Sequence, residues 1–341
     1  MRLLQVMASD KTGGAELFFG RLCAALQDRG LSQRALIRRG AVCRTDLDAG
    51  GVPTVTMPFL ANGDLYSRLL IRRQIKDFAP DILLSWMSRA ATLCPASPRF
   101  VHVARLGGYY KMKYFRHCDH LVGNTQHLVS YFIDHGWPAE RVHYLPNFVD
   151  ERPATAIRRD SLDTPEEVPL LLALGRLHSD KAFDILLAAM ARLPDAHLWL
   201  AGEGPLLAAL QAQSEALGIA SRIRFLGWRD DALSLLEAAD ILVCPSRVEP
   251  LGNVILEAWV HRRPVVAAAS TGPAGLITDG VDGLLVPMED PDALAAALTE
   301  LVADRRLAEK LARGGRMTYE SRFSRPAVVD HYLEFFAKVA R

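Results

Sequence analysis

The chain has 341 residues, of which 50 % are hydrophobic and 23 % are charged, and its formal net charge is +1. This length exceeds one ordinary hydrophobic core and suits two domains of about 150 residues each. The composition is that of a soluble globular protein, and no apolar stretch approaches the roughly 18 residues that a membrane-spanning helix requires. A signal peptide is not expected either, since the first apolar run, residues 1–7, has the length of a strand.

The charge is unevenly distributed along the chain. Residues 1–150 carry 19 Lys and Arg against 12 Asp and Glu, a net charge of +7, whereas residues 151–341 carry 21 against 27, a net charge of −6. The first half is therefore expected to face an anionic partner, such as a membrane surface or a phosphate-bearing acceptor. No RNA- or DNA-binding signature is present, so nucleic acid is not an expected partner.

The cysteines and histidines favour neither disulfides nor a metal site. The five cysteines are scattered and include no Cys-x-x-Cys pair, which indicates a reducing compartment. Six of the ten histidines fall between His102 and His143, but they form no His-x-x-x-His helix and have no carboxylate set nearby, so no bound metal is expected. The expected localisation is the cytoplasm.

Short apolar runs alternate with helical patterns along most of the chain, which predicts strand–helix–strand units and parallel sheets. In the first half a helix is expected to begin near Glu16 and to end at a cap on Gly30. The strands expected in this half are Leu3–Met7, Gln33–Ile37, Thr54–Met57, Ile82–Trp86, Phe100–Ala104, His120–Gly123 and Val142–Leu145.

The second half repeats this rhythm after the charged, proline-containing segment 150–168, which is expected to be a linker. A last helical pattern covers residues 323–341. We expect two doubly wound α/β domains, residues 1–150 and 151–322, that face each other across a cleft and bind ligands at the carboxyl ends of their strands. The strands expected in the second half are Leu170–Leu174, His197–Ala201, Ile223–Leu226, Ile241–Cys244, Val265–Ala268 and Leu284–Val286.

The strongest chemical signal is EPLGNVILE, residues 249–257, which passes from a strand end through Gly252 into a helix. The N–H groups of residues 251–253 would lie at the helix N-terminus, where unpaired donors and the helix dipole favour a phosphate. Glu249, in the loop, could accept hydrogen bonds from sugar hydroxyls, and Glu257, on the helix, could bind a ribose diol. The alternative is an ordinary helix start with solvated acids.

Three other segments follow strands in the same half. In GRLHSDK, Arg176 and Lys181 suit a diphosphate, because arginine offers a bidentate fork and lysine a point charge. AGEGP, which contains Gly202 and Gly204, could line the same site or be a simple tight turn. RFLGW ends at Trp228, which could flank a nucleobase together with the next residue. For an isolated arginine–lysine pair the alternative is a solvated surface.

Two segments of the first half are weaker signals. TGGAE, Thr12–Glu16, opens a helix after the first strand, but it is not Gly-x-Gly-x-x-Gly and no acidic residue follows the second strand, which weakens a dinucleotide-binding interpretation. Its adjacent glycines would still let a phosphate or sugar approach the backbone. The basic aromatic stretch Tyr109–His117 is either an acceptor-side or membrane-side surface, or a solvated helix with a partly buried aromatic stripe.

The order of these motifs, Gly-Gly-Ala-Glu, Gly-Arg-Leu…Lys, Gly-Glu-Gly-Pro and Glu-Pro-Leu-Gly-Asn…Glu-Ala, resembles that of the retaining glycosyltransferases of family four, which have the GT-B fold. The resemblance covers nearly the whole chain and points to the bacterial lipopolysaccharide and capsule enzymes. It implies that Arg176 and Lys181 hold the donor diphosphate. It also implies that Glu257 holds the ribose, that Glu249 meets the transferred sugar and that Gly14 approaches the diphosphate from the opposite domain.

The resemblance extends to the ends of both domains, with some departures. LPNFVD, residues 145–150, is similar to the family's Pro-Asn-Gly-Val-Asp segment, and the last helix is expected to pack back onto the first domain. Many relatives carry a histidine at the carboxyl end of the strand that corresponds to FVHVAR. Here Arg105 occupies that end, so we expect Arg105 in the site and interpret His102 as structural. Ala182 and Gly275 replace residues that are usual in the family.

The implied activity is the metal-independent, retaining transfer of a hexosyl unit from a nucleotide diphosphate sugar, with a UDP-sugar favoured over GDP-mannose. The expected acceptor is a saccharide or lipid-linked saccharide of the cell envelope, met at the inner face of the cytoplasmic membrane, and no permanently bound cofactor is expected. The alternatives are a nucleotide-sugar epimerase, a phosphorylase or an inactive sugar-nucleotide-binding protein. Residues assigned to catalysis are Glu249, Arg176, Lys181 and Arg105, and residues assigned to donor binding are Gly13, Gly14, Gly202, Gly204, Trp228, Arg229, Leu251, Gly252, Asn253, Val254 and Glu257.

Overall fold

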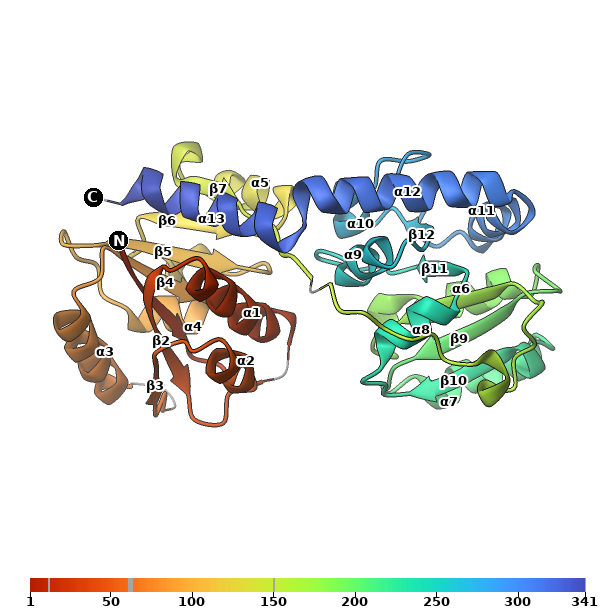
Figure 1. The fold of residues 1–341 in the computed structure, drawn as a ribbon, viewed down its shortest axis with the longest axis horizontal. Helices are drawn as coiled ribbons and strands as arrows, with labels where there is room; N and C mark the ends of the chain where they lie inside the picture. Colours follow the sequence, from red (N-terminus) through yellow and green to blue (C-terminus); the bar gives the residue numbers. More distant parts are fainter. Residues whose placement is uncertain (12, 61–63, 150, 341) are drawn as a thin grey trace. The chain divides into compact units, whose positions relative to one another are not determined.

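The computed structural model describes residues 1–11, 13–60, 64–149 and 151–340 (Figure 1). The chain forms two compact units. Unit 1 comprises Met1–Phe148 together with Arg325–Arg341, and unit 2 comprises Val149–Ser324. Thr12 of the TGGAE motif, Asp150 of LPNFVD and Arg341 at the end of the last helical pattern lie outside the described residues.

Unit 1 is built on a parallel sheet that follows the order β3-β2-β1-β4-β5-β6-β7. Chain order reverses between β1 and β4, which are hydrogen-bonded neighbours, so the sheet is doubly wound. The strands are β1 (Arg2–Met7), β2 (Ser32–Arg38), β3 (Thr54–Met57), β4 (Ile82–Trp86), β5 (Val101–Leu106), β6 (His120–Gly123) and β7 (Val142–Tyr144).

Helices cover both faces of this sheet, because its strands are apolar on both sides. Helices α1, α2 and α13 bury their apolar residues in one core cluster, and α3, α4 and α5 bury theirs in two others. The helices of unit 1 are α1 (Gly14–Asp28), α2 (Arg44–Ala49), α3 (Leu65–Phe78), α4 (Met87–Leu93), α5 (Gln126–Asp134) and α13 (Arg325–Val339), with short 3-10 turns at Met112–Tyr114 and Ala139–Arg141.

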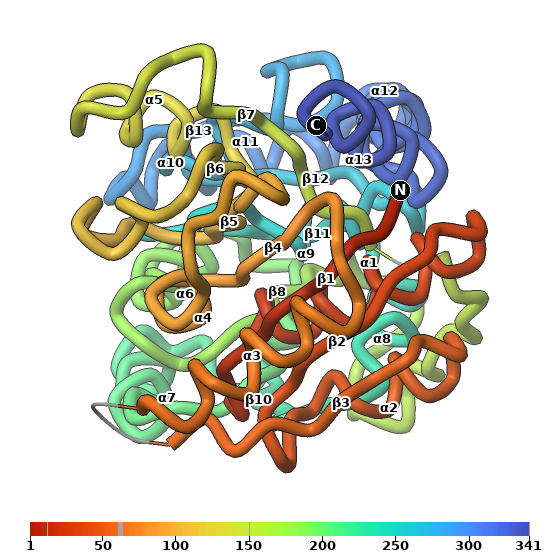
Figure 2. The backbone as a smooth tube through the Cα atoms, turned by 90° about the vertical axis from the view of Figure 1, so that its left-hand side faces the viewer, coloured from red at the N-terminus to blue at the C-terminus, as the bar shows by residue number. Residues whose placement is uncertain are grey.

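Helix α13 is the last segment of the chain and belongs to the core of unit 1 (Figures 1 and 2). It buries Val328, Tyr332 and Phe336 beside α1. Ion pairs Arg29–Asp330 and Arg325–Asp28 join the two helices on the outside, the first at 2.6 Å. Apolar burial of this size outweighs exposed ion pairs, so the three buried side chains account for most of the attachment.

Unit 2 has a parallel sheet in the order β10-β9-β8-β11-β12-β13, which reverses between β8 and β11. Helices α6, α7 and α11 pack in one core cluster, and α8, α9 and α10 pack in another. Its elements are β8 (Leu170–Leu174), β9 (His197–Ala201), β10 (Ile223–Gly227), β11 (Ile241–Cys244), β12 (Val265–Ala268), β13 (Leu284–Val286), α6 (Phe183–Met190), α7 (Leu207–Ala216), α8 (Ala232–Ala238), α9 (Asn253–Val260), α10 (Thr271–Leu276), α11 (Pro291–Ala303) and α12 (Arg305–Arg322), with 3-10 turns at Arg159–Leu162, Ser179–Lys181 and Ala220–Arg222.

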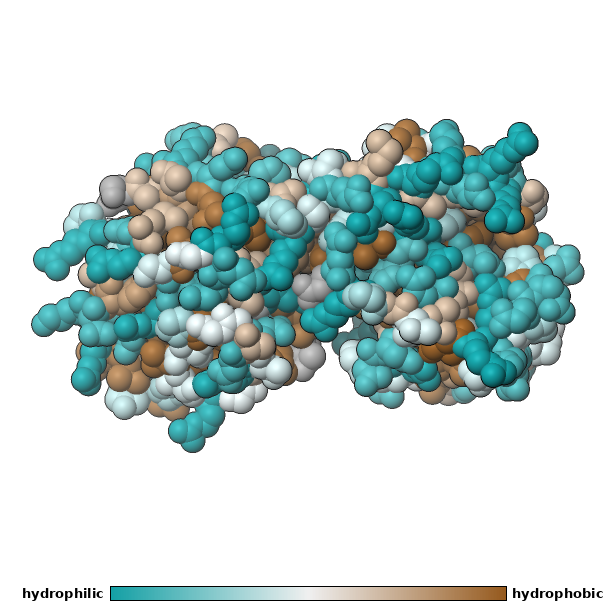
Figure 3. Space-filling model, in the orientation of Figure 1, coloured by the Kyte–Doolittle hydropathy of each residue, from teal (hydrophilic) through white to brown (hydrophobic). Residues whose placement is uncertain are grey.

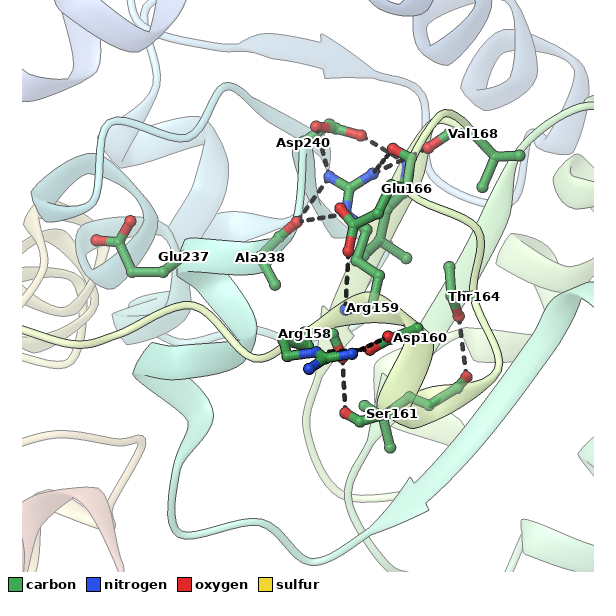
Figure 4. A network of polar contacts seen from close by, with 12 residues as sticks. Arg158, Arg159, Asp160, Ser161, Thr164, Glu166, Val168, Glu237, Ala238 and Asp240 are labelled. Atoms are coloured by element: carbon green, nitrogen blue, oxygen red, sulfur yellow. Dashed lines mark hydrogen bonds and ion pairs between the residues drawn. The ribbon is translucent and has the colours of Figure 1, made fainter.

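The predicted linker is folded onto unit 2 where the structure describes it. Arg159 donates to the carbonyl oxygens of Glu166, Val168 and Ala238 at 2.7–3.1 Å, and to Asp240 Oδ1 at 2.9 Å (Figure 4). One guanidinium thus satisfies carbonyl groups that two other segments would leave unpaired. Arg159, one of the charged residues of this segment, thus attaches it to the rest of unit 2.

The fold class predicted from the sequence, two doubly wound α/β sheets, is confirmed. Most expected strands agree with the observed ones within one or two residues at each end, as is normal for such boundaries. The difference that matters for the site is at β5, which continues two residues past the predicted end at Ala104 and includes Arg105 and Leu106. Among the described residues, every helix is too short or too polar to cross a bilayer.

Candidate functional site

The candidate site lies in unit 2, at the carboxyl ends of β8 and β11, where the strand order reverses. Helices that leave two such neighbouring strands depart to opposite faces of the sheet, which opens a crevice between their first loops. One loop, residues 175–182, runs from β8 to α6, and the other, residues 245–252, runs from β11 to α9. Both loops carry residues singled out in the sequence.

The two loops meet in an ion pair between Lys181 Nζ and Glu249 Oε2. The side chains are only 23 % and 12 % exposed, so water screens their attraction less than at an open surface. Ser246 Oγ also donates to Glu249 Oε2, at 3.4 Å. The neighbouring thiol of Cys244 has its pKa raised to about 11 by burial and by the charge of Glu249, so it stays protonated at neutral pH and is a poor nucleophile.

Arg247 fixes this arrangement, and sequence reasoning did not single it out. Its guanidinium contacts both oxygens of Asp184 at 2.7–2.8 Å and the carbonyl oxygen of Ser179 at 2.8 Å. It also pairs with Glu289, and these two carboxylates raise the pKa of Arg247 further above its already high value. The β11 loop is therefore attached to the β8 loop by a permanent cation. The sequence signal was an arginine three residues after the end of β11 and two residues before Glu249.

Glycines allow the loops after β8 and β9 to pack backbone against backbone. Gly202 has φ +148°, and a Cβ at this position would lie 1.8 Å from the carbonyl oxygen of Gly175. A Cβ at Gly204 would lie 2.3 Å from the carbonyl oxygen of Leu177. Hydrogen bonds from Gly175 N to Ala201 O and from Gly202 N to Gly227 O, at 3.0 and 2.7 Å, continue this contact to the β10 end. Only glycine fits at these positions.

The start of α9 forms the next side of the site. Gly252 is its N-cap at φ +90°, and Gly272, after β12, donates its N–H to the carbonyl oxygen of Glu249 at 2.8 Å. Leu251 is buried, whereas Asn253, Val254 and Glu257 are half-buried. The Asn253 Oδ1 atom is buried and accepts no hydrogen bond from the described residues. The helix N-terminus suits an anionic ligand, and the open Asn253 Oδ1 atom could accept a hydrogen bond from a donor group such as a hydroxyl.

Arg176 and Trp228 are the exposed members of the candidate site. Arg176 follows Gly175 at the end of β8 and is exposed to solvent. The Trp228 side chain is 72 % exposed, and its backbone N–H lies 3.4 Å from Glu203 Oε1. Arg229 instead makes a bidentate pair with Asp231, at 2.6 and 2.7 Å, and this bond lowers the pKa of Asp231. The exposed indole face is therefore the feature of this turn that could stack on a base.

In unit 1 the two glycines of TGGAE lie at the start of α1. Gly13 is the N-cap in an extended conformation and Gly14 is the first helical residue and is exposed. Glu16 is 6 % exposed and accepts a hydrogen bond from Ser9 Oγ at 2.5 Å. Its carboxylate occupies space beside Gly13, where a Cβ would come within 2.7 Å of Glu16 Oε2.

The expectation that Arg105 faces a ligand needs correction. Its side chain is 1 % exposed and lies in the core of unit 1. The guanidinium donates to Tyr332 Oη at 3.3 Å and to Asn147 Oδ1, and it stacks on Phe18 and Trp86 with distances of 4.7 and 4.6 Å to the ring centroids. These partners come from α13, from the segment after β7, from α1 and from β4, so Arg105 joins the elements of unit 1 rather than presenting a charge.

His102 has the structural surroundings expected of it. It is fully buried, its Nε2 lies 2.8 Å from Ser85 Oγ, and its Nδ1 lies 3.1 Å from the carbonyl oxygen of His117. Burial lowers the pKa of His102 to about 4, so the ring is neutral at pH 7. Within the described ranges, no group of three or more His, Cys, Asp or Glu side chains is placed to hold a metal ion.

The arrangement in unit 2 can bind an anion and hold a second, neutral group beside it. Cationic side chains Arg176 and Lys181, the amide end of α9 and a tryptophan face are carried by neighbouring strand ends of one sheet. Such groups stabilise negative charge that develops on a leaving group, and they need little reorganisation because their loops are fixed. The carboxylate of Glu249 can accept hydrogen bonds from hydroxyl groups. This is the chemistry of a group transfer from a phosphorylated donor.

Comparison with known proteins agrees with this geometry. Residues 12–152 match the model of Glycosyltransferase Family 4, and residues 168–304 match that of Glycosyl transferases group 1. The chain is 39 % identical, over 96 % of both chains, to "Lipopolysaccharide core biosynthesis glycosyltransferase LpsE" of Rhizobium meliloti (strain 1021). It is 36 % identical, over 95 % of both chains, to LpsD of the same strain.

Solved structures show the same fold. Anabaena Alr3699/HepE in complex with UDP and glucose has a TM-score of 0.83 to this chain at 22 % identity, covering 99 % of this chain and 100 % of that one. The resemblance in sequence to LpsE extends over nearly the full length of both proteins, and the fold is the two-sheet GT-B architecture. The chain therefore belongs to the family 4 glycosyltransferases.

Proposed function

We propose that the protein is a retaining glycosyltransferase that moves a hexosyl unit from a nucleotide diphosphate sugar, preferably a UDP-sugar, to a saccharide or lipid-linked saccharide of the cell envelope. The observation that carries the proposal is the meeting of Lys181 and Glu249 at the sheet reversal of unit 2, beside the start of α9. The names of LpsE and LpsD support an acceptor in lipopolysaccharide core assembly. The UDP and UDP-glucose complexes of HepE support the donor class.

In this proposal Arg176 and Lys181 hold the donor diphosphate, together with the amides of residues 251–253. Glu257 holds the ribose and Trp228 stacks on the base. As the bond to the anomeric carbon breaks, negative charge accumulates on the departing diphosphate, and the cations and amides stabilise it. The diphosphate can itself receive the proton of the acceptor hydroxyl on the same face, which retains the anomeric configuration.

Glu249 lies next to the transferred sugar in this scheme and orients it through its hydroxyls. A role as covalent nucleophile is disfavoured, because the two-step hydrolase mechanism needs a second carboxylic acid about 5 Å away, and Glu249 is bonded to a lysine and a serine instead. No metal is required, since the positive charge that a metal would bring comes from Arg176, Lys181 and the helix amides. We further propose a peripheral contact of the basic unit 1 with the anionic inner face of the cytoplasmic membrane.

The decisive experiment is a thermal-shift panel of UDP, GDP and ADP and of their hexose conjugates, which needs no acceptor. A ligand present at 100 times its Kd raises the free energy of unfolding by about 2.7 kcal/mol. We expect UDP and a UDP-hexose to raise the Tm. A shift with only the guanine or only the adenine nucleotides would mean that the donor carries that base instead of uracil. The absence of any shift would overturn the proposal.

Product analysis separates the remaining candidates. An epimerase would convert the donor without any acceptor, and an inactive binding protein would show the thermal shift with no turnover on any acceptor. The transferase consumes donor and acceptor together, and the product linkage, measured by NMR, should keep the anomeric configuration of the donor. An inverted product would overturn the retaining mechanism and leave the transferase assignment intact.

A further inference from the structure

Helix α3 of unit 1 places three large apolar side chains on its outer surface. Leu65, Tyr66 and Leu69 are 71 %, 56 % and 61 % exposed. The opposite side of the helix packs on the sheet through Ser67 and Ile71, which are fully buried. The buried side of α3 positions the helix on the sheet, and the outer leucines and tyrosine leave most of their surface in solvent. Contiguous exposed apolar side chains of this kind mark an interaction surface.

The same outer side of the helix carries its cations. Leu65, Leu69, Arg72 and Lys76 follow the spacing i, i+4, i+7 and i+11, which aligns them along one face, and Arg73 lies in the adjacent row. All of these residues are exposed, as is Arg68.

Helix α3 has few acidic side chains that could neutralise these exposed cations. Its Asp77 pairs with Arg34 of β2 at 2.7 Å. The preceding Asp64 is 8 % exposed and caps the helix by accepting from Ser67 N at 2.9 Å. The outer face of α3 is therefore both apolar and strongly positive.

A basic cavity of about 490 Å³ adjoins the carboxyl-terminal half of α3. Its lining includes Arg72 and Lys76 from the helix, together with Arg2 and Arg99. The acidic residue of the lining, Asp81, already accepts a hydrogen bond from Arg2 N at 2.7 Å. The cavity is large enough for a phosphate head group and has the charge to hold it. In Figure 2, α3 lies on the side of unit 1 that faces the viewer, and Figure 3 shows projecting hydrophilic side chains beside hydrophobic ones in the region that α3 occupies in Figure 1.

We propose that the outer face of α3, defined by Leu65, Tyr66, Arg68, Leu69, Arg72, Arg73 and Lys76, is the surface that docks on an anionic phospholipid bilayer. A basic amphipathic helix of this kind lies in the interface, with its apolar side chains among the acyl chains and its cations at the phosphates. The inference rests on the membrane contact within the proposed function and assigns that contact to one helix.

The cations and the leucines of this face together distinguish an anionic bilayer from two other possible binding partners. A second copy of the chain, docked through the same face, would bring Arg68, Arg72 and Arg73 against their own counterparts, and this like-charge contact is unfavourable. A phosphorylated saccharide would engage the cations but leave the leucines in water. An anionic bilayer is the partner that engages both sets of side chains.

The basic aromatic stretch Tyr109–His117, which the sequence also suggested, is a weaker candidate. Phe115 is fully buried, and Tyr109 packs edge-on against Tyr131 with ring centroids 5.0 Å apart while its hydroxyl bonds to His127 Nδ1 at 2.8 Å. Tyr109 is therefore held against α5, and Phe115 belongs to the core. This stretch still carries Lys111, Lys113 and Arg116, which makes it a matched control for charge.

The test is co-sedimentation of the full-length protein with vesicles of phosphatidylcholine alone and of phosphatidylcholine mixed with phosphatidylglycerol. We expect binding to the mixed vesicles only, and weaker binding at high salt. The triple variant Arg72→Gln, Arg73→Gln, Lys76→Gln should bind on the order of 100-fold more weakly, since each cation near the surface contributes about 1 kcal/mol. The double variant Leu65→Ser, Leu69→Ser should lose at least about 10-fold.

The control is the triple variant Lys111→Gln, Lys113→Gln, Arg116→Gln, which removes the same charge from unit 1 and should retain most of the binding. Equal losses in the two charge variants would show that net charge, not α3, governs binding and would overturn the proposal. Binding of the leucine variant at the wild-type level would do the same. Self-association that the leucine variant abolishes, seen by analytical ultracentrifugation, would assign the face to a second copy instead.

Failure of this inference can be told from failure of the proposed function. The variants change exposed side chains, so their Tm and their thermal shift with UDP should equal those of the wild type. Vesicle binding without any nucleotide shift would remove the transferase proposal and leave the docking surface standing. A normal nucleotide shift without vesicle binding would remove only the docking surface.

Discussion

In unit 2, the strands on either side of the sheet reversal end in loops that bring Lys181 and Glu249 together, half-buried and within reach of a ligand. In unit 1, the equivalent strands β1 and β4 carry polar side chains that bond to one another inside the core. Trp86 Nε1 donates to Gln5 Oε1 at 3.2 Å, and Gln5 Nε2 donates to Gln33 Oε1 at 2.9 Å. The same topology thus carries an ion pair between two loops in one unit and a closed polar network in the other.

The difference shows that topology locates a possible site but that the side chains decide whether one exists. In unit 2 the loops approach through glycine backbones, and their charged side chains remain accessible. In unit 1 the charged residue at the strand end, Arg105, is enclosed by aromatic rings and by α13. Substitution of the charged loop side chains of unit 2 should therefore impair ligand binding, whereas substitution of the enclosed Arg105 should impair the stability of unit 1.

The largest effect is expected from Gly202→Ala. The new Cβ would lie 1.8 Å from the carbonyl oxygen of Gly175, which is backbone and cannot turn aside, and the φ of +148° adds strain. We expect the free energy of unfolding of unit 2 to fall by about 3 kcal/mol or more. The thermal shift with UDP should disappear as well, because the loop after β8 must move. Urea denaturation and the nucleotide panel measure the two effects.

Two other glycines serve as controls for this substitution. Gly218 has φ +70°, but a Cβ at this position would meet no atom within 4 Å, so Gly218→Ala should cost only about 1 kcal/mol from backbone strain. Gly275 lies in α10 with open space around it, and Gly275→Ala should be neutral or stabilising by about 0.5–1 kcal/mol. If all three variants behaved alike, the close packing of the β8 and β9 loops would be refuted.

Lys181→Ala is the next largest test and probes function directly. Loss of a charged hydrogen bond to the donor diphosphate costs about 1.5–3 kcal/mol, which is on the order of 10- to 150-fold in kcat/KM. Glu257→Ala should fall at least as far through loss of the ribose contact. Lys310→Ala removes the same charge from α12, where the lysine bonds to the carbonyl oxygen of Gly280, and should leave kcat/KM within about two-fold. Wild-type turnover of Lys181→Ala would refute its assignment to the donor.

Arg105→Met tests the comparison in unit 1, where the substitution should affect stability and not ligand binding. The substitution keeps most of the volume but leaves the hydroxyl of Tyr332 and the amide of Asn147 without their partner, which should cost about 2–3 kcal/mol of stability. The KM for the donor should not change. A fall in kcat/KM at unchanged Tm would instead place Arg105 in the catalytic machinery. Urea denaturation and steady-state kinetics on the same preparation distinguish the two results.

Much of the fold could be predicted because parallel strands buried on both faces leave a clear pattern of short apolar runs. The loop after β11 was equally clear, since a strand end, Gly252 and a helix start are contiguous in the sequence. The partners of Arg105 were not predictable, because Tyr332 lies 227 residues away and only the return of α13 brings it there. A strand-end arginine looks the same in sequence whether a ligand or an aromatic core surrounds it.

The same reason explains why Arg247 was missed and why the attachment of the predicted linker to unit 2 was not foreseen. The structural role of Arg247 depends on its pairs with Asp184 and Glu289, which lie 63 and 42 residues away in the sequence. Arg159, in the predicted linker, bonds to Ala238 and Asp240, which stand 79 and 81 residues away, a separation that no local pattern reports. Charge-rich segments suggest solvent exposure when read locally, and these two arginines are instead the bonds that hold segments together.

The smallest effect is an acid response of another buried polar group of unit 1, His102 of β5, which lies beside Ser85 Oγ and the carbonyl oxygen of His117. Burial lowers the pKa of His102 to about 4, whereas an unfolded histidine titrates near 6.5. As the pH falls from about 6.5 to about 4, the unfolded chain binds a proton that the native chain does not, so the stability that neutral His102 provides is lost over this range. At pH 5 the loss contributed by His102 should be about 1–2 kcal/mol, and it should appear in β5 of unit 1.

Native-state hydrogen exchange, corrected for the intrinsic rate at each pH, resolves the acid response of the two sheets. In His102→Gln the difference in stability between pH 7 and pH 5 should shrink by the same amount, because the group that binds the proton is gone. His331→Gln, on the exposed side of α13, should keep the difference. An acid loss in β5 that His102→Gln leaves unaltered would show that His102 is not the group responsible for it.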